Sequence, residues 1–241
     1  MVRRTTFRVA PSSGIPDSDA VPTIRAMVAT TEELLELHGR IRECTACPLH
    51  VTRTQAVPGY GPVTARIMAV GEAPGETEDR EGKPFVGAAG QLLTTLLESV
   101  GLDRRDIYIS NIIKCRPPGN RDPEQSEVES CSHFLDEQVA MLQPDVILVL
   151  GRHALARILP GAGSISRLHG QRVRRDTRTY VPLYHPAAAL YNAGLLETLE
   201  ADMQRVRGYL ADAEARRATA AAPAAAAAAV TEAPRDQLDL F

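Results

Sequence analysis

The sequence lacks tryptophan and has only four phenylalanines and six tyrosines among its 241 residues. Aliphatic side chains must therefore fill the core. A hydrophobic content of 44% is sufficient for this, because a chain of this length folds without needing disulfides. No run approaches the ~18 apolar residues of a membrane-spanning helix, and the amino terminus lacks the apolar stretch of a secretory signal. We expect a cytoplasmic protein without membrane association.

An excess of positive charge is also missing, because the formal net charge is −3. This excludes a uniformly basic protein that coats nucleic acid without specificity, so any nucleic-acid surface must be a local patch. The candidate phosphate-binding residues are Lys114, Arg116, Arg121, Arg167, Arg172, Arg174, Arg175 and Arg178. Alternatively, the arginines between residues 167 and 178 belong to a solvated hairpin that does not bind DNA.

Expected strands and helices alternate along the chain. Apolar runs predict buried strands at residues 66–71, 107–111, 145–151 and 179–184. Apolar periodicity predicts helices at residues 31–44 (with Thr31 as N-cap), 88–100, 123–142, 153–159 and 195–210, and a long loop at 71–87. This alternation predicts an α/β fold, namely a three-layer α/β/α sandwich with a central, mostly parallel sheet.

The composition changes at both ends of this region. Residues 1–30 are rich in Pro, Ser and Asp, and we expect them to be disordered. Residues 31–210 form the expected globular domain. Residues 211–236 are rich in Ala and are interrupted by Pro223 and Pro234, which predicts a flexible linker. Residues 237–241, from Gln237 to Phe241, then carry short apolar anchors that suit docking into a groove on a partner. We expect a monomer.

The sequence contains four cysteines, Cys44, Cys47, Cys115 and Cys131. The first two form a C-x-x-C pair, whereas the spacing of the other two matches no common zinc finger. Four thiolates suit either tetrahedral zinc or a [4Fe–4S] cluster. The prolines that closely follow Cys47 and Cys115 are familiar from ferredoxin-type sites. The cysteines alone leave zinc, an iron–sulfur cluster and a site without metal open.

Four segments follow expected strands at their carboxyl ends, where open α/β sheets bind ligands. A Gly- and Pro-rich turn that includes Gly71 and Gly75 allows backbone N–H groups to approach a ligand. The other segments bring Phe85, Asn111 and His185 to the same edge of the sheet. Each segment alone is a weak indicator of function, and their combination is much more specific.

These segments, together with the cysteine spacing, closely resemble the iron–sulfur uracil-DNA glycosylases of family four over about residues 31–210. The resemblance implies a hydrolase that removes uracil from single- and double-stranded DNA and leaves an abasic site. It also implies that the four cysteines ligate a [4Fe–4S] cluster. Separately, residues 237–241 resemble the bacterial sliding-clamp-binding pentapeptide, and a chance match of five residues is the alternative.

The resemblance also assigns roles to site residues. Phe85 matches the aromatic ring that stacks on the flipped base, Asn111 the amide that reads the pyrimidine edge, and His185 the histidine that faces uracil O2. We expect Asn111 and His185 to be catalytic, together with Glu72, which the resemblance places only as a loop acid near the pocket. The implied substrate contacts are Gly71, Ala73, Gly75, Glu78, Phe85, Asn111, Asn120, His185 and Leu190.

The chemistry of the reaction requires these residue types. A base must leave the duplex before its glycosidic bond is accessible, and stacking and edge hydrogen bonds then hold it. A neutral imidazole stabilises the negative charge that develops on O2. This chain has Ala73 where the best-known uracil glycosylases have a water-orienting aspartate. Glu72 is therefore our first candidate for water activation, with Asn111 or leaving-group stabilisation alone as alternatives. Leu190 and Tyr191, the latter where the family often has a basic residue, are candidates for the wedge that fills the vacated stack.

Two other functions are compatible with parts of the sequence. The first is a relative that becomes covalently trapped on uracil-DNA, although the inserted basic loop of that subgroup is absent after Asn111. The second is a structural or redox iron–sulfur or zinc protein, which leaves the converging Phe85, Asn111 and His185 unexplained.

Overall fold

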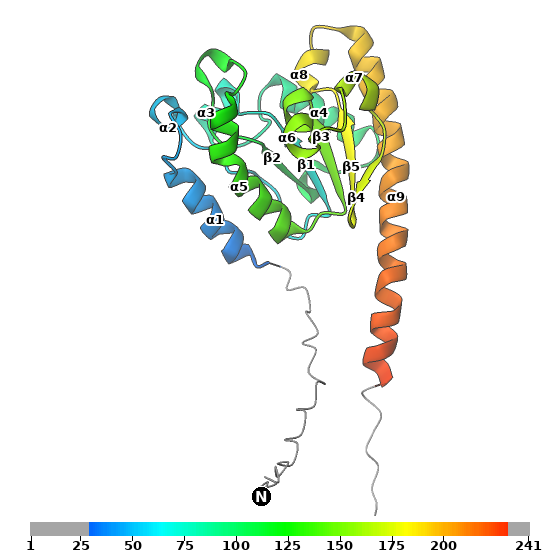
Figure 1. Ribbon diagram of the computed structural model, residues 1–241. Helices are drawn as coiled ribbons and strands as arrows, with labels where there is room; N and C mark the ends of the chain where they lie inside the picture. The colour runs from blue at the N-terminus through cyan, green and yellow to red at the C-terminus, as the bar shows by residue number, and fades with distance from the viewer. Residues whose placement is uncertain (1–28, 231–241) are drawn as a thin grey trace, which may run out of the picture.

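A computed structural model describes residues 29–230 as a five-stranded sheet with helices on both faces (Figure 1). The strand order is β2-β1-β3-β5-β4, in which β4 alone is antiparallel to its neighbour. The strands are β1 (Ile67–Gly71), β2 (Ile107–Asn111), β3 (Val146–Leu150), β4 (Val173–Arg175) and β5 (Arg178–Leu183). The predicted strands are thus confirmed, within a few residues at their ends.

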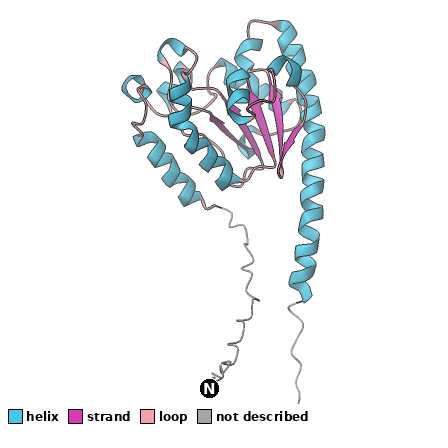
Figure 2. Cartoon of the chain, viewed as in Figure 1, coloured by secondary structure: helices cyan, strands magenta, loops and turns pink. Residues whose placement is uncertain are grey.

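Helices cover the sheet on both sides, as Figure 2 shows with the strands between them. Helices α1 (Thr31–Glu43), α5 (Gln125–Leu142) and α6 (Arg152–Ile158) pack on one face. Helices α4 (Ala88–Glu98) and α9 (Ala193–Val230) pack on the other. Successive strand side chains alternate between these two cores: Met68 and Val70 face the first group, and Ala69 the second. The predicted α/β/α sandwich is confirmed.

Several short elements were not predicted, because one turn of helix gives no apolar period. They are α2 (Leu49–Thr52), α3 (Glu76–Glu81), α7 (Ile165–Leu168), α8 (Pro186–Ala189) and the 3₁₀ turns η1 (Arg104–Asp106) and η2 (Pro118–Asn120). Helix α3 lies within the segment that we expected to be a long loop.

The cap of the first helix differs from the prediction by one residue. Thr30, not Thr31, is the N-cap of α1: its hydroxyl accepts from the Glu33 backbone N–H at 3.2 Å, and the Glu33 carboxylate accepts from the Thr30 N–H at 2.7 Å. Two successive threonines leave the sequence ambiguous, and this reciprocal pair of hydrogen bonds decides between them.

The carboxyl-terminal helix corrects the predicted domain end. Residues 211–230, expected as linker, continue α9 (Figure 1). Alanine has the highest helix propensity, and Ala213 is buried against the sheet. Arg216 Nη2 donates to Thr179 Oγ1 at 3.2 Å, and an Arg217 nitrogen lies 3.5 Å from an Asp145 oxygen. Helix α9 therefore contacts the rest of the domain at least as far as Arg217.

Two predicted segments lie largely or wholly outside the described residues. These are the amino-terminal segment up to residue 28 and the pentapeptide at residues 237–241. Among the helices between residues 29 and 230, none is long and apolar enough to cross a membrane.

The packing of α9 predicts different effects on stability for the same exchange, alanine to lysine, at two neighbouring positions. Ala213→Lys places a large charged side chain in a buried position and should lower the free energy of unfolding by roughly 1–3 kcal/mol. Ala215→Lys, on the exposed side of the same helix, should change it by less than about 0.5 kcal/mol. Urea unfolding measures both values. Equal effects of the two substitutions would mean that residues beyond 210 do not pack on the domain.

Candidate active site

A pocket of about 400 Å³ opens at the carboxyl ends of the parallel strands. The pairing of β1 with β2 aligns Gly71 with Asn111, so the loops that follow these strands begin side by side. The segments after β3 and β5 reach the same edge. The pocket is lined by Glu72, Ala73, Pro74, Gly75, Glu78, Phe85, Ala89, Pro117, Asn120, Arg121, His185, Ala187 and Ala188. Most of the predicted site residues therefore come together.

Gly71 and Asn111 are not among the lining residues, but they lie directly behind Phe85, which is one of them. A Cβ atom on Gly71 would lie 2.5 Å from Phe85 Cζ and 2.6 Å from Asn111 Oδ1, so only glycine fits between the ring and the amide. Asn111 is 1% exposed. Within the described part of the chain, its Oδ1 atom has no hydrogen-bond partner. A buried amide oxygen without a partner is costly, so this atom is available to accept a hydrogen bond from a group outside the chain.

The backbone around Phe85 is held in an unusual conformation. Phe85 has a φ of +52°, which for a bulky residue costs on the order of 1–3 kcal/mol. Close packing of α4 maintains it, since a Cβ on Gly90 would lie 1.9 Å from the Phe85 carbonyl oxygen. Glu78 Oε1 accepts from the N–H groups of Val86 at 2.9 Å and Gly87 at 2.8 Å. Glu78 lines the pocket as predicted, but its carboxylate orders the loop that presents Phe85.

His185 is the N-cap of α8 and stacks on Phe85, with ring centroids 5.5 Å apart. Its Nδ1 atom accepts from the Ala187 backbone N–H at 3.1 Å. An accepting Nδ1 is unprotonated, so the neutral ring carries its proton on Nε2. Burial lowers the pKa of His185 to about 4. The imidazole is therefore neutral near pH 7, with Nε2–H as its donor.

Glu72 forms a polar group with two residues that the sequence did not single out, Asp122 and His153. His153 Nε2 lies 3.9 Å from Glu72 Oε2 and 3.4 Å from Asp122 Oδ2. Burial raises the pKa of Glu72, and the nearby His153 partly offsets this effect. Asp122 is also paired with Arg152, at 2.5 Å. His153 follows β3 by three residues, and this position near the carboxyl end of a strand could have marked it as a candidate site residue.

The remaining predicted residues are divided between the pocket and its surroundings. Ala73, Gly75 and Asn120 line the pocket. Leu190 and Tyr191 lie outside its lining, after α8, where they are 40% and 93% exposed. Two large apolar side chains exposed next to a pocket are consistent with contact to a ligand larger than the pocket itself.

The four cysteines line a second cavity, although they come from distant parts of the sequence. None of them, all within the described residues, forms a disulfide. Arg53 Nη1 donates to Cys115 Sγ at 3.0 Å, and Arg53 Nη2 donates to the Arg42 carbonyl at 2.7 Å. Four soft sulfur ligands with an N–H···S hydrogen bond fit a metal–thiolate site, and a [4Fe–4S] cluster is compatible with this donor set.

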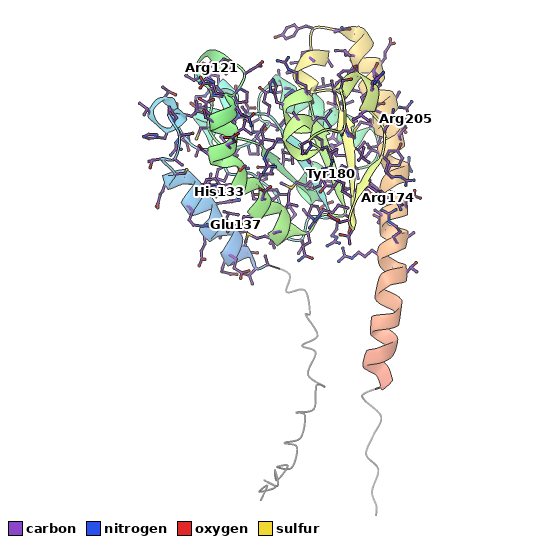
Figure 3. The ribbon with its side chains drawn as sticks, viewed as in Figure 1. Arg121, His133, Glu137, Arg174, Tyr180 and Arg205 are labelled. Carbon is purple, nitrogen blue, oxygen red and sulfur yellow. The ribbon has the colours of Figure 1, made fainter. Side chains whose placement is uncertain are left out.

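The predicted phosphate-binding patch is wrong in several of its members. Lys114 is 2% exposed, because its side chain turns inward to buried acceptors. Arg174, Arg175 and Arg178 lie where β5 begins, at the opposite end of the sheet from the pocket. Figure 3 shows Arg121 and Arg174 at these opposite ends. Near the pocket, Arg116 donates to Asn120 Oδ1 at 2.7 Å, and Arg121 lines the pocket wall.

The sequence profile of the uracil DNA glycosylase superfamily matches residues 58–210, and the chain belongs to this superfamily. A type-4 uracil-DNA glycosylase of Sulfurisphaera tokodaii is 44% identical over 185 residues, covering 73% of this chain and 84% of the relative. A protein of Thermotoga maritima with the same name is 42% identical, covering 75% of this chain and 97% of the relative. One of Archaeoglobus fulgidus is 45% identical, covering 73% and 92%.

The hydrogen bond to Nδ1 and the burial of the ring predict the protonation of His185. Its imidazole nitrogens should give the signals of a neutral ring protonated on Nε2 from about pH 8 to about pH 5.5, whereas an exposed histidine titrates near 6.5. Nitrogen-15 NMR of histidine-labelled protein measures this, with His185→Gln to assign the signals. An imidazolium signal from His185 above about pH 6 would contradict the assignment.

Proposed function

We propose that this chain binds a uracil base flipped out of DNA and hydrolyses its bond to deoxyribose, leaving an abasic site. The observation that carries the proposal is that residues far apart in sequence converge: Phe85 and His185 stack in the lining of one pocket, and the Asn111 amide lies directly behind Phe85. A stacking ring, an amide and a neutral imidazole are the groups that hold a single pyrimidine and stabilise it as a leaving group.

Recognition depends on Asn111. Its Oδ1 atom accepts from uracil N3–H, which supplies the donor that this buried atom lacks in the protein alone. Its amide N–H donates to uracil O4. Cytosine presents an unprotonated N3 and an amino group at the same positions, and each unpaired buried group costs about 1–3 kcal/mol. The amide thus favours uracil over cytosine, and Phe85 supplies the stacking surface.

Cleavage depends on His185. As the C1′–N1 bond breaks, its electron pair moves to the uracil ring and the negative charge is shared with O2. His185 Nε2–H donates to O2, since the Ala187 N–H holds the ring in this tautomer. A neutral donor does not lose its proton to the departing base, and its hydrogen bond strengthens as charge develops.

Water attacks C1′ and loses a proton, for which Glu72 is the proposed acceptor. Glu72 lines the pocket, and its raised pKa makes it a stronger base than an exposed carboxylate. His153 lies close enough to stabilise the ionised form. Ala73 has no polar side chain, and Glu72 directly precedes it in the chain. Glu72 is therefore the carboxylate that we propose in place of the missing aspartate.

The four cysteines are proposed to ligate a [4Fe–4S] cluster. The bonds between their thiolates and iron would cross-link distant segments of the chain. The ligands join the end of α1, the loop after β2 and the middle of α5. The loop after β2 begins at Asn111, so the cross-link restrains the segment that carries the amide. Arg116 and Arg121 are proposed to contact phosphates at the pocket edge, and Leu190 with Tyr191 to fill the vacated stack.

The proposed function is tested with uracil-containing and matched cytosine-containing oligonucleotides, both single- and double-stranded. The protein should contain about four iron atoms per chain and make alkali-labile sites in the uracil strands alone. Asn111→Ala and His185→Ala should each slow excision by about 10²–10³-fold, because each removes a group that acts on the base. The exposed Arg207→Ala serves as the control.

Several outcomes would contradict this account. Absence of alkali-labile sites with an iron-loaded sample would refute the glycosylase function. A protein–DNA band that resists denaturation would indicate covalent trapping instead. Excision at the normal rate by both pocket variants would show that the site has been misassigned.

The carboxyl-terminal residues 237–241 are proposed to bind the bacterial sliding clamp. Their sequence, Gln-Leu-Asp-Leu-Phe, combines a polar residue with apolar anchors. Deletion of these five residues should abolish binding to a purified clamp and leave excision from short oligonucleotides unchanged. The exchange of Leu240 and Phe241 for alanine should have the same effect, and clamp binding by both variants would refute this proposal.

A further inference from the structure

Lys114 is among the largest fully buried side chains of the protein, and the proposed reaction does not use it. Its Nζ atom donates to Ser110 Oγ, to the Asn111 carbonyl oxygen and to Gln138 Oε1, each at 2.8 Å. An ammonium group has three N–H donors, and all three are used here. A buried ammonium group without hydrogen-bond partners would be strongly destabilising. The Lys114 ammonium therefore holds its three acceptors in place around it.

The acceptors of Lys114 are themselves anchored in the core. Gln138, on α5, donates through Nε2 to Tyr108 Oη at 2.9 Å and to the Pro58 carbonyl at 2.8 Å. Tyr108 Oη also lies 2.7 Å from His38 Nε2 on α1. The ammonium therefore connects the end of β2 to two helices that cover the same face of the sheet. In such a network, the position of each member depends on the others.

Lys114 also lies at the cysteine site. It lines the cavity shared by the four cysteines and directly precedes Cys115 in the chain. Its own carbonyl accepts from the Val57 N–H at 2.7 Å, which fixes its backbone. One residue thus borders the cysteine cavity and hydrogen-bonds the main chain of Asn111.

We infer that Lys114 is a positioning residue, which holds the carbonyl of Asn111 and so aims the Asn111 amide at the base. The inference rests on the proposed function, because it assigns Asn111 the reading of uracil. The carbonyl and the side chain of Asn111 belong to the same residue at the very end of β2. Loss of the Lys114 hydrogen bond frees that residue to rotate, and displacements of about 1 Å at a reacting group can slow catalysis by about 10²-fold.

The alternative role for Lys114 is to compensate the negative charge of a metal–thiolate site. The two roles predict different losses. A positioning role lowers the rate of base excision while iron and DNA binding stay normal. A role confined to the cysteine site lowers the iron content first, and excision falls with it.

The test compares Lys114→Met, Lys114→Gln and the control Tyr108→Phe in the full chain. Tyr108→Phe breaks the same network at Gln138 but touches neither Asn111 nor a cysteine. The measurements are single-turnover excision from a single-stranded uracil oligonucleotide, iron per chain, and affinity for DNA that carries a tetrahydrofuran abasic-site analogue. Lys114→Met should excise about 10–100-fold more slowly, with iron content and affinity within about 2-fold of the unsubstituted protein.

The conservative variant Lys114→Gln and the control Tyr108→Phe complete the test. Lys114→Gln keeps N–H donors on a shorter side chain and should recover part of the rate, whereas Tyr108→Phe should stay within about 3-fold of the normal rate. If Lys114→Met does not fold, Lys114→Gln carries the comparison with Tyr108→Phe. Normal excision by Lys114→Gln and Lys114→Met, or loss of iron in proportion to activity, would overturn the inference. Failure of the unsubstituted protein to excise uracil would instead refute the proposed function.

Discussion

The parallel pairing of β1 with β2 is the constraint on which the site depends. It aligns Gly71 with Asn111 at the carboxyl ends of the two strands. The absence of a side chain at Gly71 then lets the Phe85 ring and the Asn111 amide approach the same point. A shift in this register would move Asn111 away from Phe85. The buried strands and the tightly packed core on both faces fix the register, because a slip by one residue would exchange the two faces of β2.

The site combines groups whose environments give them opposite properties. His185 is held neutral by burial and by the hydrogen bond at Nδ1, so it acts as a donor near pH 7. Glu72 is made more basic by burial but lies beside His153, which favours its ionised form. In the proposed reaction, His185 is the donor to the leaving group and Glu72 is the base for water. The environment of each group favours the protonation state that its proposed role requires.

The sequence predicted the sheet and most of the site, because buried strands give strong apolar signals and ligands bind at strand ends. It could not predict the role of Glu78, since nothing in its local sequence indicates that its carboxylate binds the Val86 and Gly87 N–H groups. The sequence predicts a surface position for Lys114, where most lysines lie, and its three buried acceptors explain why it is inside. The composition after residue 210 predicts a linker because Ala213, which packs on the core, has no periodic apolar pattern around it to reveal a buried face.

In the proposed complex, the Phe85 ring, the Asn111 amide and the His185 imidazole together hold one everted base. The most direct measurement is a crystal structure with DNA that carries a 2′-fluoro-2′-deoxyuridine, whose glycosidic bond resists hydrolysis. We expect the uracil ring to stack on Phe85, with N3 and O4 about 3 Å from the Asn111 amide and O2 about 3 Å from His185 Nε2. A uracil bound elsewhere, or bound in the pocket with its edge away from Asn111 and His185, would contradict it.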